Sequence, residues 1–310
     1  MIKYLKNDEI DKTRWDKSIR SAFNGIIYAY SWYLDIVCDG WEALIENDYE
    51  RVFPLTGRKK YGISYLFQPY FTQQLGIFSR SILSAEVVEN FLQAIPKKYR
   101  YIEINLNTLN KIDSDGFEVT PQLNHELDLI NAYDNISKHY SQNTKRNIKK
   151  AQKSGLTIMK NQKPDVLIEM FRQNKGREIQ HLKDKDYMML RKLIYACIYK
   201  GLAEIYGAFT DYNELCAGAV FVHSNKKSIF LFSGLDTRGR EHSAMFMIID
   251  AYIQDHAHQH LVFDFDGSND TDLARFYKGF GSTECHYLRI HRNNLPGLVK
   301  SVVKMIKKFR

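Results

Sequence analysis

Apolar and polar residues alternate in two hairpin patterns, one in each half of the chain. Residues Glu42–Leu55 predict a strand, an Asn-Asp-Tyr turn and a second strand, and Ala203–Val222 repeats this plan around an Asp-Tyr-Asn turn. A further aromatic-rich strand is predicted after each hairpin, at Ile63–Phe67 and at Ser228–Phe232. The two halves of the chain therefore share one order of elements.

A helix and a strand complete this plan in each half. Ser84 is placed to cap the first helix and Pro96 to stop it, and the second helix is expected from about Ser243 to His258. The strands that follow, Tyr101–Leu106 and Val262–Asp266, alternate with a period of two. Hairpins followed by a helix and a strand predict an α+β (α/β) fold, in which each lobe has a mixed, mostly antiparallel sheet flanked by helices.

The length of the chain agrees with two lobes, because 310 residues favour about two domains. We place the lobes at residues 1–130 and 135–295, with the exit from the first lobe in Asn110–Gln122 and a basic C-terminal helix or tail at 296–310. A hydrophobic content of 44%, with only six Pro, excludes a mostly disordered chain.

The N-terminal sequence and the cysteine usage favour a cytoplasmic protein. MIKYLKNDEIDKTRW lacks the apolar core of a secretory signal, and no stretch approaches the roughly 18 apolar residues of a membrane helix. The four cysteines form no C-x-x-C pair, so we expect reduced thiols rather than disulfides or a zinc site. These residues are Cys38, Cys197, Cys216 and Cys285.

Positive charge is concentrated in the middle of a chain whose net charge is +8. No acidic residue occurs between Asn135 and Pro164, where the cations include Lys138, Lys145, Arg146, Lys149, Lys150, Lys153 and Lys160. Such a patch attracts the phosphates of a nucleotide, a lipid headgroup or RNA, although most charge runs are solvated helix faces.

A helix is predicted within this basic segment. Ser141 or Asn143 can cap it, and Gly155 can end it. Its cations then gather on one face: Lys145, Lys149 and Lys153 at intervals of four, with Arg146 and Lys150 beside them.

The segment Leu261–Gly281, LVFDFDGSNDTDLARFYKGFG, carries the most informative pattern. Two Phe alternate with Asp264 and Asp266 in a strand, a Gly-Ser-Asn turn follows, and a short helix with Phe-Tyr-Lys ends at Gly-Phe-Gly. This order resembles the closing unit of the GNAT acyltransferase fold, and more narrowly its FemAB-like branch and the BioF2-like acetyltransferases. The helix in Tyr140–Thr157 resembles a Thr/Ser-x-Arg-Asn-Ile-x-Lys-Ala helix of FemAB-type proteins. The resemblance implies an acyltransferase with two tandem GNAT-like lobes.

The resemblance also assigns roles to two residues at the end of the closing helix. Tyr277 matches a Tyr that protonates the departing thiolate in GNAT enzymes, although an aromatic residue here would also pack the helix against the sheet. Lys278 matches the Lys of the FemAB Phe-Lys motif, which meets substrate phosphate. The spacing to the next Phe is one residue shorter than usual, and a surface charge is the alternative.

Asp264 and Asp266 are the other catalytic candidates. They are expected on one face of a strand, near a strand end of the kind where α/β sheets bind ligands. One of them could act as general base, directly or through water, or hold the substrate amine. Because a buried carboxylate is unfavourable unless it is paired or functional, ion pairs with Arg238, Arg240 or Arg275 are the alternative.

By this resemblance, the stretch Arg238–Ala244 corresponds to the segment with which acyl-CoA-dependent GNAT enzymes bind pyrophosphate at a helix N-terminus. Here Glu241 replaces a Gly and would repel phosphate. The resemblance therefore leaves two donors, acyl-CoA (acetyl-CoA) and the aminoacyl-tRNA that FemAB-type enzymes use. The residues expected to bind the donor are Arg238, His242, Ser243, Ala244, Lys145 and Arg146.

Polar residues in Tyr65–Gly76 predict an acceptor site. Gln68, Gln73 and Gln74 among so many aromatic residues suit a sugar or a peptide, and a packed turn around Pro69 is the alternative.

Histidines occur at alternate positions in the stretch DHAHQH. His256 and His260 are four apart, as two metal ligands on one helix face would be. No third ligand is evident, and His suits a helix C-terminus, so no metal is expected.

Together these features predict a cytoplasmic N-acyltransferase. It would move an acetyl or aminoacyl group from a phosphate-bearing donor, tRNA included, to the amine of a small substrate or of an envelope or polysaccharide precursor. The alternatives are an acetyl-CoA N-acetyltransferase of a small amine or amino sugar, a nucleic-acid-binding protein that uses the basic helix, and a catalytically degenerate GNAT-fold pair. RNA affinity would fit a tRNA donor and a nucleic-acid-binding protein equally, so turnover is what separates them.

Overall fold

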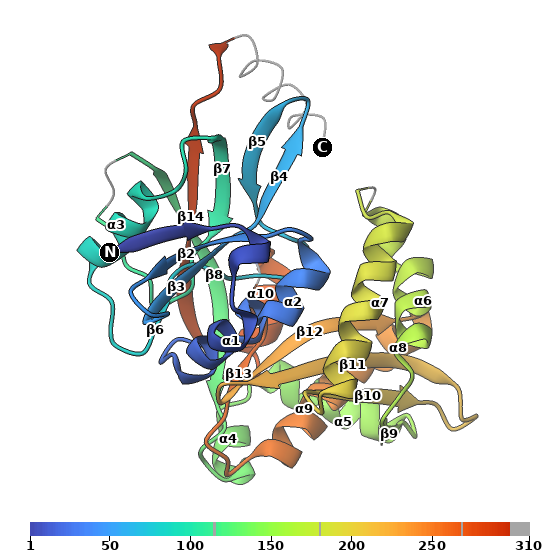
Figure 1. Cartoon of the computed structure of the whole chain (residues 1–310). Coiled ribbons are helices and arrows are strands. Elements are labelled where there is room, and N and C mark those ends of the chain that lie inside the picture. The colour runs from blue at the N-terminus through green and yellow to red at the C-terminus, as the bar shows by residue number, and fades with distance from the viewer. Residues whose placement is uncertain (114–115, 180, 268, 298–310) are drawn as a thin grey trace. The chain divides into compact units, whose positions relative to one another are not determined.

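The computed structural model describes residues 1–113, 116–179, 181–267 and 269–297 (Figure 1). The chain forms two compact units, one of Met1–Gln122 with the segment from His286 onward and the other of Leu123–Cys285. These bounds differ from the sequence-based lobes at two places, because residues 123–130 belong to the second unit and 286–295 to the first. Of the tail expected at 296–310, residues 298–310 lie outside the described residues.

The first unit contains two sets of strands. In the first set, β1, β2, β3 and β6 pair in that order, all antiparallel. In the second set, β4, β5, β7 and β14 pair in that order, with β5 and β7 parallel. The strands are β1 (Ile2–Leu5), β2 (Glu42–Glu46), β3 (Arg51–Leu55), β4 (Gly57–Lys60), β5 (Ile63–Phe67), β6 (Phe78–Ser79), β7 (Tyr99–Asn105) and β14 (Thr283–Asn293), and the helices are α1 (Lys12–Ser21), α2 (Ser31–Val37) and α3 (Ala85–Gln93).

The local predictions for this unit are confirmed. Strands β2 and β3 form the expected hairpin, whose turn is made by left-handed residues at Asn47 and Tyr49. The Ser84 side chain accepts a hydrogen bond from the Val87 N–H at 3.3 Å, and α3 ends before Pro96. The apolar faces of these elements meet in one core, which includes the fully buried Phe53, Leu66, Phe91 and Ile102.

The second unit is one sheet with helices on both faces. Its strands lie in the order β8-β13-β12-β11-β10-β9, and β12 and β13 are the parallel pair. The strands are β8 (Glu118–Asp128), β9 (Thr157–Lys160), β10 (Ala203–Phe209), β11 (Leu215–Ser224), β12 (Lys227–Leu235) and β13 (Val262–Asp264). The helices are α4 (Tyr133–Lys138), α5 (Gln142–Lys153), α6 (Pro164–Gln173), α7 (Asp184–Tyr199), α8 (Thr237–Glu241), α9 (Ala244–His256) and α10 (Thr271–Lys278).

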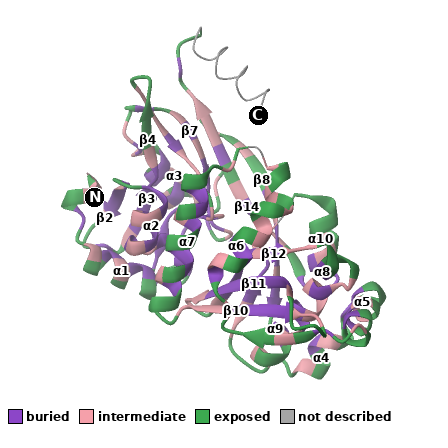
Figure 2. Ribbon diagram, turned by 90° about the vertical axis from the view of Figure 1, so that its right-hand side faces the viewer, coloured by how far each residue is buried: buried purple, intermediate pink, exposed green. Residues whose placement is uncertain are grey.

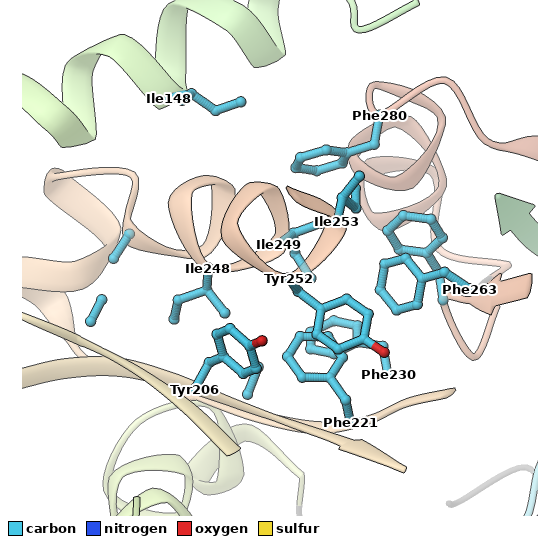
Figure 3. Close-up of a cluster of buried hydrophobic side chains, with 14 of the residues drawn as sticks. Ile148, Tyr206, Phe221, Phe230, Ile248, Ile249, Tyr252, Ile253, Phe263 and Phe280 are labelled. Atoms are coloured by element: carbon cyan, nitrogen blue, oxygen red, sulfur yellow. The ribbon is translucent and has the colours of Figure 1, made fainter. Parts of the chain in front are cut away.

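Aromatic side chains fill the core between this sheet and α9. Phe221 of β11 stacks on Tyr252 of α9 with ring centroids 3.8 Å apart, and Tyr206 and Phe263 pack around them (Figure 3). All four side chains are fully buried, and Figure 2 shows β10 and β11 as largely buried strands. The long helix α9 is therefore fixed against the sheet by packed rings, and hydrogen bonds from Tyr252 to Ser228 at 2.5 Å and from Tyr206 to Asp255 at 2.7 Å add to this packing.

Glycines bring α6 close to the other face of the sheet. A Cβ atom at Gly234 would lie 2.6 Å from the Leu167 carbonyl oxygen, and one at Gly218 would lie 2.6 Å from the Leu167 side chain. Only a residue without a side chain fits between strand and helix at these two positions. The mixed α/β class predicted from the sequence is thus confirmed, with helices covering both faces of the second sheet.

Among the described residues, every helix falls short of the combined length and hydropathy that a bilayer-spanning segment requires.

Candidate active site

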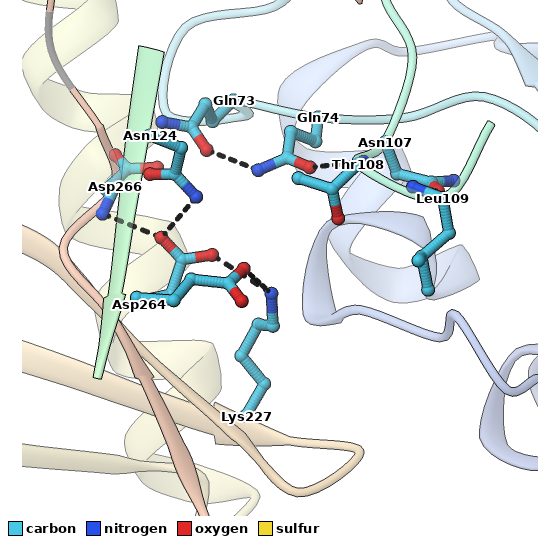
Figure 4. Close-up of polar contacts among 10 residues, drawn as sticks. Gln73, Gln74, Asn107, Thr108, Leu109, Asn124, Lys227, Asp264 and Asp266 are labelled. Atoms are coloured by element: carbon cyan, nitrogen blue, oxygen red, sulfur yellow. Dashed lines mark hydrogen bonds and ion pairs between the residues drawn. The ribbon is translucent and has the colours of Figure 1, made fainter. Parts of the chain in front are cut away.

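A row of polar side chains crosses three neighbouring strands of the second unit. Glu126 on β8 lies directly opposite Asp264 on β13, and Lys227 opens β12 on the other side of β13. The Lys227 Nζ atom lies 3.2 Å from Asp264 Oδ2 and also donates to Glu126, while Asn124 Nδ2 donates to Asp264 Oδ1 at 3.0 Å (Figure 4). We call Asn124, Glu126, Lys227 and Asp264 the polar row.

The polar row is largely withdrawn from water. The Asp264 side chain is only 1% exposed and that of Lys227 is 19% exposed. Burial alone would lower the pKa of Lys227, but the carboxylates of Asp264 and Glu126 outweigh burial and raise that pKa above its usual range. Lys227 therefore stays charged and forms ion pairs with both carboxylates at neutral pH.

The prediction that Asp264 and Asp266 share one strand face is wrong. Strand β13 ends at Asp264, and Asp266 has a left-handed backbone with φ of 57°. The cause is local, because Asp264 Oδ1 accepts a hydrogen bond from the Asp266 N–H at 2.9 Å and thereby turns the chain out of the sheet. The ion-pair partner of Asp264 is Lys227, whereas Arg238 pairs with Asp236 and Glu214.

Tyr277 lies on α10 and is buried, with 7% of the residue exposed. The ring packs against Phe265 and His125, with centroids 5.0 and 6.0 Å away. Burial raises the pKa of Tyr277, and the carboxylates of Asp266, Asp270 and Asp264 raise it further. The hydroxyl is therefore protonated at neutral pH, as a proton donor must be. The three predicted catalytic residues, Tyr277, Asp264 and Asp266, share one neighbourhood.

Lys278, one residue further along α10, lies at the surface. Its Nζ atom forms an ion pair with Glu284 at 3.1 Å, and its side chain is 66% exposed. This contact agrees with the surface-charge interpretation that the sequence left open.

The stretch Arg238–Ala244 forms α8 and the start of α9. The Asp236 side chain caps α8 through the Gly239 N–H at 2.8 Å and also pairs with Arg238. Arg238 lines a cavity of about 480 Å³ whose walls include three acidic residues, Asp165, Glu169 and Asp236. Acidic residues neutralise the charge of Arg238, and their negative charge would repel a phosphate in this cavity.

The end of this stretch leads instead to the basic helix. His242 follows α8, and Ser243, with φ of 60°, precedes the fully buried Ala244 at the start of α9. Ser243 Oγ donates to Asn147 Oδ1 on α5 at 2.9 Å. The N-terminus of α9 and the helix α5 are therefore neighbours.

Helix α5 presents the cations that the sequence predicted on one face. They line a surface hollow of about 570 Å³ together with Gln142 and Ser154. None of these cations forms an ion pair with another described residue. We call this surface the basic face; it consists of Lys145, Arg146, Lys149, Lys150 and Lys153.

The cap predicted for α5 is confirmed and leads to a stability prediction. Ser141 Oγ accepts the Thr144 N–H at 3.1 Å, so Ser141→Ala is expected to lower the free energy of unfolding by about 1 kcal/mol. Urea denaturation of the two proteins measures the difference. Gln152→Ala on the exposed side of the same helix is the matched control, and an equal effect of both changes would contradict a capping role.

The three glutamines predicted to bind an acceptor belong to the first unit and hold its own loop. Gln68 Oε1 accepts the Asn105 N–H at 2.8 Å, and Gln74 Oε1 accepts the Thr108 N–H at 3.1 Å. Gln74 also donates to Gln73 Oε1 at 2.6 Å (Figure 4). Because these amides already bond to one another and to the end of β7 and the residues after it, the contacts favour the packed-turn alternative.

Sequence reasoning did not single out Lys227, Asn124 or Glu126. Lys227 follows the Asn225-Lys226 turn of a hairpin, where a lysine suggests an exposed side chain. The alternation of polar residues in Gln122–Asp128 was the available signal, because it places Asn124 and Glu126 on one face of β8.

Comparison with known proteins agrees with this architecture. Residues 138–278 match the family model described as acetyltransferase (GNAT) domain. The crystal structure of FemX has 14% sequence identity and a TM-score of 0.67, covering 93% of this chain and 97% of FemX. The C-terminal domain of a putative lysylphosphatidylglycerol synthetase from Agrobacterium fabrum has 10% identity and a TM-score of 0.56, with 95% of each chain covered.

A conserved protein of unknown function from Bacteroides thetaiotaomicron VPI-5482 has 11% identity and a TM-score of 0.58, covering 94% of this chain and 99% of that one. No curated protein matches the sequence. At 10–14% identity, similarity to solved structures shows that the fold is shared. The family model shows a similarity of sequence over residues 138–278. Residues 138–278 therefore match a GNAT acetyltransferase domain, and the chain is similar in fold to FemX.

Proposed function

We propose that this N-acyltransferase moves an aminoacyl or acetyl group onto the amine of a small substrate or of an envelope precursor. The observation that carries the proposal is the polar row beside Tyr277 and Asp266. Lys227 and Asp264 lie within the matched residues 138–278, and Asn124 and Glu126 lie on the strand that precedes them. A buried ion pair adds little stability compared with apolar packing. Fixed charges in a site with little water do, however, favour a reaction in which charge develops.

In the reaction, the amine nitrogen forms a bond to the acyl carbon, and the bond from that carbon to the donor's oxygen or sulfur breaks. The amine gives up a proton, and the leaving oxygen or sulfur takes one. We assign the proton donor to Tyr277, whose hydroxyl stays protonated because burial raises its pKa. We assign the acceptor of the amine proton to Asp266, which is half-buried at the turn after β13.

Asp264 has a different role in this scheme. Its two oxygens already accept hydrogen bonds from Asn124, the Asp266 N–H and Lys227. Such a carboxylate holds the turn in place, and with it the position of Asp266.

The sequence leaves two possible donors, and the contacts favour aminoacyl-tRNA. The acidic neighbours of Arg238 disfavour a pyrophosphate there, whereas the basic face of α5 is free of ion pairs with other described residues and lies next to the start of α9. One of the structural neighbours, a putative lysylphosphatidylglycerol synthetase, bears an aminoacylated lipid in its name. Acyl-CoA remains the alternative donor for the same chemistry.

The test is a transfer assay. The purified chain is incubated with bulk aminoacyl-tRNA or with acetyl-CoA and a panel of amines, and acylated amines are detected by mass spectrometry. A product formed only with aminoacyl-tRNA supports the proposal as stated, and a product formed with acetyl-CoA assigns the simpler acetyltransferase reaction. If neither donor gives a product while RNA is bound, the second candidate, an RNA-binding protein that uses the basic face, replaces it.

The basic face leads to a prediction about salt. We expect the double change Lys149→Gln and Lys153→Gln to weaken tRNA binding and to make the slope of log K against log[salt] less negative, by roughly 0.7–0.9 for each phosphate contact removed. Filter binding or fluorescence anisotropy at several salt concentrations measures this slope. Lys185→Gln with Lys192→Gln removes the same charge from exposed positions of α7. Equal slopes for the two double variants would rule out a specific contribution of the basic face.

A further inference from the structure

Three side chains that are far apart in the sequence converge at the C-terminal end of α9. Glu204 lies on β10, His223 on the neighbouring strand β11, and His256 is the last residue of α9. Glu204 pairs across from Phe221, so His223 is its diagonal neighbour on the same face of the sheet. The aromatic core fixes α9 on that face, which brings His256 to the other two.

The ligand-bearing atoms of this group are close together. The Nε2 atoms of His223 and His256 lie 3.2 and 3.0 Å from Glu204 Oε1. One ligand atom from each of the three residues lies within 4.8 Å of the others. Four ligands at the bond lengths of about 2.0–2.2 Å that zinc adopts would stand about 3.3 Å apart in a tetrahedron, so two of the three separations already have the required size.

Both imidazoles lie at ion-pair distance from the Glu204 carboxylate, and their proximity lowers the pKa of that carboxyl group. Both Nε2 atoms are buried, and neither makes a hydrogen bond of acceptable geometry despite its short distance to the carboxylate oxygen. Two imidazole nitrogens that approach one carboxylate oxygen without an aligned hydrogen bond are also spaced as ligands around a common ion would be. We propose that Glu204, His223 and His256 bind a divalent transition metal, with zinc as the ion that suits two imidazoles and one carboxylate.

The surroundings provide support and access for such an ion. The Tyr206 hydroxyl donates to Asp255 Oδ2 at 2.7 Å and lies 3.3 Å from the second oxygen of Glu204. The Tyr252 ring lies against both imidazoles, 6.1 and 4.4 Å from their centroids. The Glu204 side chain is 34% exposed, which leaves a path for the ion and a fourth position for water. A bound ion would tie the end of α9 to β10 and β11.

The pair that the sequence suggested, His256 and His260, does not form this site. Helix α9 ends at His256, and His258 beyond it has a left-handed backbone with φ of 65°, so the two histidines do not share a helix face. His260 is exposed and therefore offers a matched control. The missing ligands, Glu204 and His223, come from strands that no local pattern connects to α9.

The experiment uses the full chain after treatment with a chelator and dialysis. Calorimetric titration with Zn²⁺ alone is expected to give one equivalent bound with a Kd in the micromolar range or tighter, and a higher melting temperature in its presence. Co²⁺ is expected to give the intense visible absorption of a four-coordinate site. Loss of a residue that only hydrogen-bonds a metal ligand typically lowers metal affinity by roughly 10–100-fold. His256→Gln and His223→Gln should each lower the affinity for Zn²⁺ by more than this, whereas His260→Gln should leave that affinity unchanged.

Two outcomes would overturn the proposal. One is the absence of stoichiometric Zn²⁺ binding and of the Co²⁺ spectrum in the unaltered chain, which does not depend on whether any variant folds. The other is an equal loss of affinity in His260→Gln and His256→Gln. Circular dichroism of the metal-free variants separates lost ligation from lost folding.

Discussion

Replacing Lys227 with Met is expected to lower the free energy of unfolding by about 3–5 kcal/mol. The change removes the counter-charge of Asp264, which is 1% exposed, and of Glu126, which is 26% exposed. Met fills a similar volume, so the loss reflects uncompensated buried charge rather than a cavity. Chemical denaturation of both proteins at neutral pH provides the measurement.

The pH dependence of this effect has a definite sign. Because the carboxylates raise the folded-state pKa of Lys227, its contribution is present in full below the usual lysine pKa of about 10.4 and is lost as pH rises through the folded-state pKa. The stability difference between wild type and Lys227→Met should therefore be nearly constant from about pH 6 to 9 and shrink only in stronger alkali.

Two variants test whether the effect arises from pairing. Lys226→Met removes a charge from the exposed neighbouring position, where a change within about 0.5 kcal/mol is expected. In a double-mutant cycle, Asp264→Asn should make Lys227→Met less destabilising than it is alone. A loss for Lys227→Met no larger than that for Lys226→Met would show that the polar row is not held by this ion pair.

The elements predicted correctly are those with local signals. The Glu42–Leu55 hairpin has a turn of residues that tolerate a left-handed backbone, and Ser84 and Ser141 cap the helices that follow them. In each case the residues that determine the structure lie within four positions of one another. Over such short separations, the sequence pattern is sufficient to predict the local structure.

The predictions that went wrong or were missed depend on contacts between distant residues. Alternation extended β13 to Asp266, but the Asp264 side chain bonds the Asp266 N–H and ends the strand. Lys227 is separated from Asp264 by 37 positions and from Glu126 by 101. They pair because β8, β13 and β12 are neighbours in the sheet, and the order of elements along the chain did not predict that arrangement.

The same reason explains the remaining site residues. Tyr277 was predicted as a proton donor because a family motif surrounds it, and Arg238 was expected at phosphate for the same reason. Nothing in the motif indicated that Asp236 and Glu214 would balance the charge of Arg238. The resemblance thus pointed to positions in the sequence. Only the contacts in the structure show that Arg238 is paired with acidic residues, whereas the cations of the basic face are not paired with any described acidic residue.

Tyr277→Phe is expected to lower kcat by about 10²–10⁴-fold with the donor that turns over, because the change removes the proton for the leaving group. KM should change little, since a proton donor acts in the transition state rather than in substrate binding. The Phe ring keeps the contacts with Phe265 and His125, so the melting temperature should stay close to that of the wild type. Steady-state kinetics and thermal denaturation measure the two effects.

Tyr133→Phe provides the matched comparison for this variant. The Tyr133 hydroxyl donates to Asp250 at 2.8 Å in the same unit, so its loss should reduce stability and leave kcat nearly unchanged. The rate should also show no decline near the usual tyrosine pKa of about 10, because burial raises the pKa of Tyr277. If the two Phe variants lower kcat equally, Tyr277 serves only to pack α10 against the sheet, and the leaving group must take its proton from water.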